Sequence, residues 1–395
     1  MAPAEPDPRR DRKVAGSVVL GWMFLSGAAL SGLVGPNRSA VEAELGIGHG
    51  AFGLGLAAIQ VGCGLAGLAL APLLRLVPPA RQMLAGMALV TAGLFTVCFT
   101  QGDAWLAVGW SIFTFGSILA FVANTLGGGI WSADPRRGVM LLHAVNGAGK
   151  AAGPMVAAVA LAWNWRWSIV AVAAMAAVTS ALVAIHQGAL ARVAPPVAPA
   201  PAGRSRGGGP LLWYVALLFA LLTGAEVSLQ TLLPLFYERE HGVPAPVASM
   251  LFTVHLAGLA AGRFLTLGCS ARVSHRAIIG GCLATAVFIV PAIVGRDWFW
   301  WAAGLFLAGG MHSGTWATLY AQSAERMDHA PTLLNLGIAF GCLAGIAACV
   351  VASSRIAEWS LAGGIWFSMA VLAAFALCYF AGPFGRAPAV RDADG

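Results

Sequence analysis

One carboxylate stands alone in a strongly apolar part of the sequence. Glu226 lies in the run TGAEVSLQTLLPLF, with Thr223 three residues before it and Gln230 four residues after it. On a helix this spacing places the three side chains on one face. A charge at the centre of a bilayer costs about 2.5–3.5 kcal/mol on insertion scales, so such a group should face the protein interior and mark a pathway. We predict that Glu226 titrates a coupling proton or binds substrate. The alternative is a structural acid bonded to Gln230 or paired with a base.

A second polar stripe has the same helical spacing. His143, Asn146 and Lys150 follow one another at i, i+3 and i+7, and Lys150 falls near the middle of its apolar run. Lys150 could bind an anionic substrate, or it could pair with Glu226 in one conformation and be released in another. The alternative is a packing role in which backbone carbonyls satisfy the ammonium group.

Other side chains in the apolar runs are weaker candidates for a cavity lining: Asn124, Gln60, His255, His312 and Trp316. A hydrogen-bonded Asn or His between membrane helices can instead stabilise packing, by about 0.6 kcal/mol. His312 and Trp316 are four residues apart, so on one continuous helix they could present a hydrogen-bond donor and a stacking face to the same ligand.

The elements that must position these residues are membrane helices. Hydrophobic residues make up 59% of the chain and charged residues 10%, whereas soluble domains average about 45–50% and about 25%. Apolar runs of about 18–25 residues can each cross a bilayer as a helix, and the alternating pattern of a membrane β-barrel is missing from the sequence. We predict an all-α membrane protein with twelve spans near residues 14–36, 50–74, 82–101, 104–131, 138–162, 166–187, 211–236, 246–268, 276–295, 298–322, 331–354 and 359–382.

Basic residues are divided unevenly between alternate connections. With the N-terminus inside, 16 Lys and Arg residues fall on the cytoplasmic side and 5 on the outer side, as the positive-inside rule requires. Both termini are then cytoplasmic, and the net charge of +7 needs no nucleic-acid partner. A Pro-, Ala- and Gly-rich stretch predicts a flexible linker. The expected organisation is a cytoplasmic tail at 1–13, a six-helix bundle at 14–188, a cytoplasmic linker at 189–210, a second six-helix bundle at 211–384 and a tail at 385–395.

The two halves look duplicated. LLHAVNGAGKAAGP at residue 141 aligns with LLNLGIAFGCLAGI at residue 333, which is an offset of 192. An offset of 195 aligns Gln60 with His255 and Gly67 with Gly262. Parallel six-helix repeats are a transporter design in which the substrate site lies near the midplane between the repeats. The duplication therefore predicts two pseudo-symmetric bundles around a central cavity.

Taken together, the chain resembles the major facilitator superfamily over nearly its whole length. Members usually carry a G-x-x-x-D-R-x-G-R-like loop after the second span, and here LAPLLRLVPPARQ keeps Arg75 and Arg81 but has Leu74 at the acid position. The corresponding loop after the eighth span, GCSARVSHR, keeps Arg272 and Arg276 but has Ala271 at the acid position. Both loops have lost the acid, so the resemblance implies the fold without the usual charge relay of gating.

Further residues are expected to act in gating or helix packing. Gly149, Gly153 and Pro154 form GKAAGP, which is similar to the G-x-x-x-G-P of the family's fifth helix. The two glycines permit close helix approach, and the proline bends the helix. Arg263, near the inner end of the eighth span, could join a gating ion pair, but the positive-inside rule also explains it.

The second half is similar to the branch of fucose, galactose and glucose proton symporters, through GAEVSLQTLLPLF and ASMLFTVHLAGLAAGRF. That resemblance implies a small polar solute. The acids that the branch places in its first and fourth helices have no counterpart here, and G-x-x-x-G-P is also prominent in proton-coupled drug antiporters. Uptake of a sugar-like solute or an organic anion therefore stands beside drug or metabolite efflux.

The expected function is secondary active transport by alternating access, coupled to protons.

 The solute and a coupling proton are the expected partners, within a lipid bilayer and as a monomer. A polytopic enzyme would need a zinc motif or paired acids at one depth, and a sensor would need larger soluble regions, so we predict neither. The seven cysteines have no zinc spacing, and we expect no metal and no cofactor. The Ala- and Arg-rich composition is typical of a GC-rich bacterial source. We therefore expect a multi-pass protein of the bacterial inner membrane.

Overall fold

The computed structural model describes residues 7–74, 76–99, 102–131, 135–194, 208–269, 272–327 and 331–385, and within these ranges every regular element is a helix. The helices are α1 (Pro8–Leu33), α2 (Arg38–Leu45), α3 (His49–Leu74), α4 (Pro79–Phe99), α5 (Asp103–Ala120), α6 (Ala123–Ile130), α7 (Pro135–Ala160), α8 (Arg166–Ile185), α9 (Gln187–Val193), α10 (Gly208–Glu240), α11 (Ala245–Cys269), α12 (His275–Phe288), α13 (Val290–Val294), α14 (Trp298–His312), α15 (Thr315–Arg326), α16 (Pro331–Ala357) and α17 (Leu361–Ala381).

Several helix starts follow directly from the local sequence. Asp297, Ser274 and Ser360 each accept a hydrogen bond from a backbone N–H in the first turn of α14, α12 and α17. Such side chains satisfy donors that have no partner within the helix. Apolar residues then continue each helix, which keeps its backbone hydrogen bonds internal, as a bilayer requires.

Nine helices in the described part of the chain are long and apolar enough to cross a membrane. The three remaining predicted spans are 104–131, 138–162 and 298–322. The first and third are each interrupted, so the prediction of two continuous helices was wrong: α5 gives way to α6 at Phe121–Val122, and α14 gives way to α15 at Ser313–Gly314. The second is the unbroken helix α7, whose polar stripe makes it less apolar than its neighbours.

Other boundaries also differ from the sequence prediction. A short helix, α2, occupies the connection between the first two spans. Helix α9 continues to Val193, so residues 189–193 are helical rather than part of an extended linker, because Ala189 and Leu190 are buried against the bundle. Helix α10 begins at Gly208, slightly before the predicted start of the second bundle.

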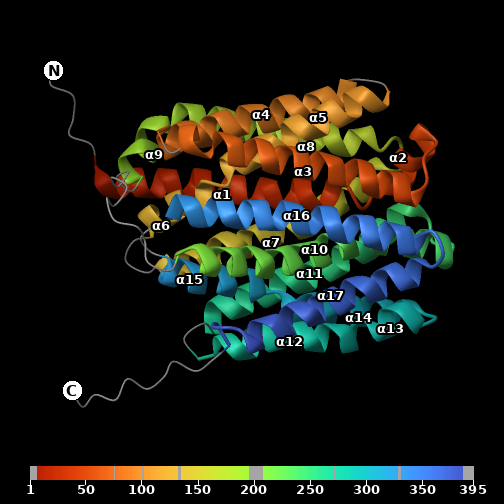
Figure 1. Ribbon diagram of the computed structural model, residues 1–395. Helices are drawn as coiled ribbons and strands as arrows, with labels where there is room; N and C mark the ends of the chain where they lie inside the picture. The colour runs from red at the N-terminus through yellow and green to blue at the C-terminus, as the bar shows by residue number, and fades with distance from the viewer. Residues whose placement is uncertain are drawn as a thin grey trace, which may run out of the picture.

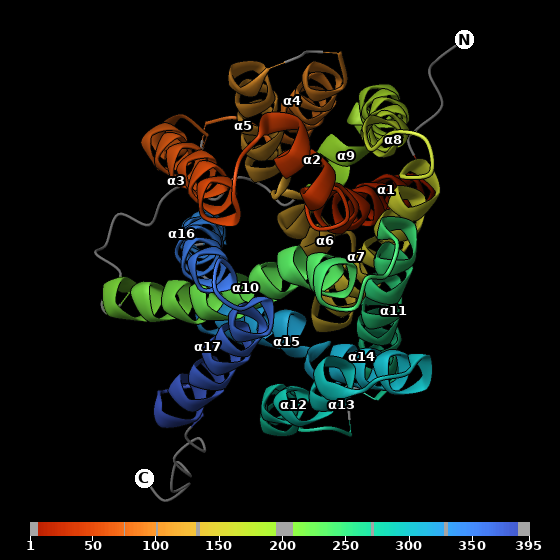
Figure 2. The same ribbon diagram turned by 90° about the vertical axis from the view of Figure 1, so that its right-hand side faces the viewer.

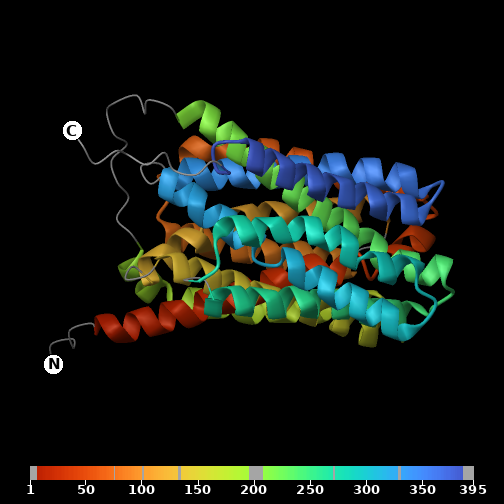
Figure 3. The ribbon, with the colours of Figure 1, turned by 90° about the horizontal axis from the view of Figure 1, so that it is seen from below.

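The long helices run roughly along one direction, and this is visible from the side and from below (Figures 1 and 3). Helix α1 begins and α17 ends at the same end of the molecule, and we call the opposite end, which carries α2, the distal end (Figure 1). Seen from the distal end, α1, α3, α4, α5 and α8 lie in the upper part and α10 to α17 in the lower part (Figure 2). Helix α7 contacts α11, and α3 contacts α16, across this division.

Equivalent packing in the two parts supports the duplication. A side chain at Gly149 would overlap the carbonyl oxygen of Phe24, and one at Gly341 would overlap that of Ala216. Gly341 follows Gly149 by 192 residues and Ala216 follows Phe24 by 192 residues, which is the offset that relates the two sequence motifs. At the second offset, 195, Gly67 faces Ile118 and Gly262 faces Ser313. Helix pairs α1–α7 and α10–α16 therefore pack in matching registers.

Candidate functional site

Two charged side chains meet between α7 and α10. Lys150 donates to Oε1 of Glu226, and Gln230 Nε2 donates to the same oxygen at 2.9 Å. Lys150 is 8% exposed and Glu226 is 6% exposed. Glu226 and Gln230 thus share a helix face, as predicted. Of the alternatives considered for Lys150, the contact with Glu226 is the one present here, in an environment where an unpaired charge would be costly. Thr223, one turn before Glu226, contacts Cys342 Sγ at 3.2 Å instead.

A second cation lies beside this pair. Arg263 of α11 is only 5% exposed. Its Nη1 donates to the backbone oxygen of His143 at 2.9 Å and to Oδ1 of Asn146 at 3.0 Å, and its Nε donates to the backbone oxygen of Ser313 at 3.2 Å. Asn146 in turn donates to α1, through the Met23 carbonyl and the Ser26 hydroxyl, at 3.1 Å each. Arg263, in α11, therefore connects α7 to the break between α14 and α15. The distribution of basic residues in the sequence did not predict these contacts.

Aromatic rings surround His143. Its ring lies 4.1 Å from that of Trp316, between ring centroids, and Trp316 stacks on Tyr320 at 5.5 Å. Phe219 contacts the other rings through Trp316, at 4.9 Å. His143 Nε2 is buried without a hydrogen-bond partner. The polar stripe of α7 thus faces an aromatic cluster contributed by α10 and α15.

His312 and Trp316 do not form the shared ligand face that their spacing suggested. The helix breaks between them at Ser313–Gly314. His312 stacks instead against His255, with 5.7 Å between ring centroids, and each of the two rings contacts a backbone oxygen. Nε2 of His255 is buried without a hydrogen-bond partner.

The remaining predicted residues are placed as follows. Gln60 lies in α3, half-buried. Asn124 lies in α6, and its side chain is outside the described part, as is the whole of Arg75. Arg81 and Arg272 are exposed, and Arg276 donates to the backbone oxygen of Gly385.

The glycines and proline of α7 lie where close packing was expected. A side chain at Gly153 would overlap the Ala28 carbonyl of α1. Pro154 lies inside the helix, and its carbonyl accepts a 2.7 Å hydrogen bond from Ser249 of α11.

A charged network at the distal end was not predicted from the sequence. Arg38 is fully buried, and its Nε donates to Glu42 Oε1 at 2.8 Å, while His49 Nδ1 lies 2.8 Å from Glu42 Oε2. Arg38 Nη2 also donates to Ser354 Oγ of α16 at 3.3 Å. Glu358 accepts from the backbone N–H of Gly50 at 3.0 Å. The i, i+4 spacing of Arg38 and Glu42 was the available signal.

The Glu42 carboxyl has an altered pKa. Burial by itself would raise this pKa, but the hydrogen bond with His49 and the positive charge of Arg38 outweigh burial and hold it below its ordinary value. Glu42 is therefore ionised at neutral pH and keeps the network joined.

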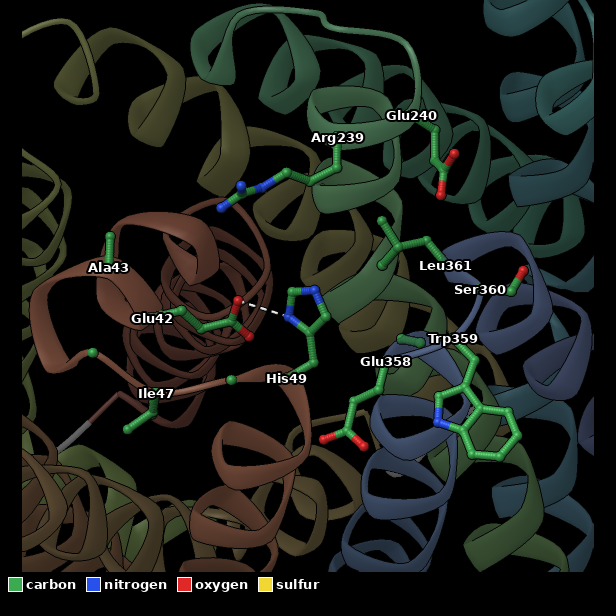
Figure 4. Close-up of a pocket in the computed structure, with 13 residues that line it drawn as sticks. Glu42, Ala43, Ile47, His49, Arg239, Glu240, Glu358, Trp359, Ser360 and Leu361 are labelled. Carbon is green, nitrogen blue, oxygen red and sulfur yellow. Dashed lines mark hydrogen bonds and ion pairs between the residues drawn. The ribbon is translucent and has the colours of Figure 1, made fainter.

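A cavity of about 640 Å³ opens beside this network (Figure 4). Its lining combines α2 with the end of α10 and the α16–α17 connection, and Figure 4 shows the Glu42–His49 contact facing Glu358 and Trp359. The cavity lies at the distal end and does not contain the Lys150–Glu226 pair. No cluster of three potential metal ligands occurs among the residues that the structure describes.

Comparison with known proteins gives a family match and structural matches. The sequence matches the Major Facilitator Superfamily over residues 19–349. The crystal structure of a Major Facilitator Superfamily transporter, FucP, in the outward conformation superposes with a TM-score of 0.62 and 15% sequence identity, over 93% of this chain and 99% of that chain. At this identity the similarity is one of fold. No curated protein matches the chain.

Proposed function

The chain belongs to the Major Facilitator Superfamily, and from this premise we propose that it moves a small polar organic solute across the membrane by proton-coupled alternating access. The family match confirms the resemblance noted in the sequence, and it identifies a multi-pass membrane transporter of small solutes. The finer proposal is a bundle of twelve spans in two six-helix halves joined through residues 189–210, with both termini cytoplasmic, in a bacterial inner membrane.

The observation that carries the proposal is the Lys150–Glu226 ion pair. Its two residues come from α7 and α10, which belong to different proposed halves. Rocking of the halves would have to break or exchange this contact. Protonation of Glu226 removes the attraction, because a neutral carboxyl no longer attracts the ammonium group. Lys150 is then free to bind an oxygen of the solute, which links proton uptake to solute binding.

Efflux of a drug or metabolite by the same fold is the second candidate. The aromatic rings of Trp316, Tyr320 and Phe219 favour it, since they offer a largely apolar surface beside the charged pair. Under this alternative, Glu226 would exchange a proton for the solute, and transport would run against the direction of proton entry.

The test is solute transport by purified protein in proteoliposomes, with and without a pH gradient, after a thermal-shift screen has identified a ligand. Glu226→Gln removes the titrating group but keeps a similar shape. We expect it to bind ligand and to lose acceleration by the pH gradient. Glu240→Gln is the matched control, because Glu240 is exposed at the end of the same helix. Gradient-driven transport by Glu226→Gln at the wild-type rate would refute proton coupling through this carboxylate.

A further inference from the structure

The buried centre contains more positive than negative charge. Glu226 is paired with Lys150, so its negative charge is already matched. Arg263 is equally buried, and among the described residues no carboxylate lies within ion-pair distance of its guanidinium. Its three hydrogen-bond acceptors are two backbone oxygens and one amide oxygen, all neutral.

These acceptors offset only part of the cost of burying the charge. Moving an ion from water into a protein interior costs several kcal/mol even after relaxation. Ser313 follows the C-terminal end of α14, where the helix dipole favours a cation, but that effect is typically about 0.3–1 kcal/mol. Glu226 attracts Arg263 from beyond ion-pair distance but is in direct contact with Lys150. Among the described residues the three groups therefore carry a net positive charge, which a bound anion would offset.

We propose that the transported solute is an organic anion, a carboxylate, and that Arg263 is the residue that binds its carboxylate group. This inference rests on the transport function proposed above and narrows its solute class. A guanidinium stays charged in proteins and forms strong, charge-assisted hydrogen bonds with carboxylate oxygens. The hydrogen bonds of Arg263 to the described residues use Nε and Nη1, so the two N–H donors of Nη2 are left to hold a carboxylate oxygen.

The neighbouring groups suit the rest of such a solute. Arg263 is bonded to the backbone of His143, whose Nε2 is buried without a partner and offers a hydrogen bond to the solute. The ring of Trp316, which lies against His143, provides an apolar face for a ring or a short carbon chain. Arg263 and His143 come from α11 and α7, so separation of the proposed halves would open the site between them.

The experiment compares matched probes by thermal shift on the purified full-length protein at constant ionic strength. The probe pairs are gluconate with glucose, and benzoate with benzamide, so that each pair differs chiefly in the carboxylate. We expect at least one carboxylate to raise the melting temperature more than its neutral partner does. We expect Arg263→Gln to weaken that binding about tenfold to a hundredfold, as loss of hydrogen bonds to a charged group predicts.

Two further variants separate binding from folding. Arg276→Gln removes one positive charge from an exposed position and should leave the carboxylate shift unchanged. Arg263→Lys keeps the charge but loses the planar guanidinium that positions Nη2, so it should retain weaker binding. The melting temperature without ligand shows whether each variant is folded, and the wild-type comparison of carboxylate with neutral probe needs no variant at all.

Three results would overturn the proposal: equal shifts by the carboxylates and their neutral partners, no shift by either carboxylate, or an unchanged carboxylate shift in Arg263→Gln. These results leave the proposed transport function standing, because that function is tested separately by the response of Glu226→Gln to a pH gradient. Conversely, Glu226→Gln could keep gradient-driven transport while Arg263→Gln loses carboxylate binding, and then only proton coupling would fail.

Discussion

The centre and the distal end of this protein each bury charged side chains, but they balance the charge differently. At the distal end, Arg38 and Glu42 neutralise one another, and His49 completes the network. In the centre, Lys150 and Glu226 form one pair, and Arg263 has no carboxylate within ion-pair distance among the residues that the structure describes. A cluster whose charges balance suits a contact that holds helices together, whereas a cluster with excess positive charge suits a site that binds an anion.

Their surroundings differ in the same sense. The distal network lies beside an open cavity and joins α2 to α16 through Ser354. The central groups join α7 to α10 and α11 and are enclosed by aromatic rings and packed helices. Arg38 and Lys150 are both buried, but Glu42 also contacts His49. Removing the cation from the centre should therefore cost more than removing the cation from the distal end.

The largest effect is expected for Lys150→Ala. It leaves Glu226 buried without its cation, and loss of one partner of a buried pair typically costs about 3–5 kcal/mol. The measurement is thermal unfolding of the purified protein at pH 7. The double variant Lys150→Met with Glu226→Leu should recover most of that stability, because it leaves no unpaired charge, yet it should not transport. If Lys150→Ala were as stable as the wild type, the ion pair with Lys150 would not be what stabilises the buried Glu226 carboxylate.

A smaller effect is expected for Arg38→Met. Glu42 would keep its contact with His49, so the loss should be about 1–3 kcal/mol, the cost of hydrogen bonds left unmade. Arg239→Met is the control, since Arg239 lines the same cavity but is exposed. If Arg38→Met destabilised the protein more than Lys150→Ala, the proposed difference between the two regions would be reversed.

The distal network should also respond to acid. The pKa of Glu42 is lower in the folded protein than its ordinary value, so its contribution to stability is complete above the ordinary value and is lost as pH falls through the folded value. The difference in melting temperature between wild type and Glu42→Gln should therefore shrink as the pH falls below about 4.5. A difference that stays constant from pH 7 to pH 3 would contradict this assignment.

The smallest effect is expected at the opposite end of the molecule. Arg192 of α9 pairs with Asp11 of α1 through two contacts of 2.5 and 2.9 Å, but its side chain is exposed. Exposed ion pairs contribute little, because water and salt screen them. Arg192→Gln should melt within experimental error of the wild type in moderate salt, and a clear loss would mean that this pair holds α9 to the bundle.

Sequence patterns predicted the central polar stripes because a helix has a regular period. His143, Asn146 and Lys150 lie in one continuous helix, as do Glu226 and Gln230. The same reasoning failed for His312 and Trp316, where the helix breaks at Ser313–Gly314. A helical period relates two residues only while the backbone hydrogen bonds continue between them.

The sequence by itself determined that the chain is a helical membrane protein, that its two parts repeat one pattern, and that few charges enter the apolar segments. These properties depend on composition and local periodicity, which a bilayer constrains strongly. Only the tertiary structure decided that Lys150 meets Glu226, that Arg263 is buried with no described acid in direct contact, and that Arg38 reaches α16. Those contacts join residues far apart in the chain, and their partners are chosen by how helices pack, which local sequence does not encode.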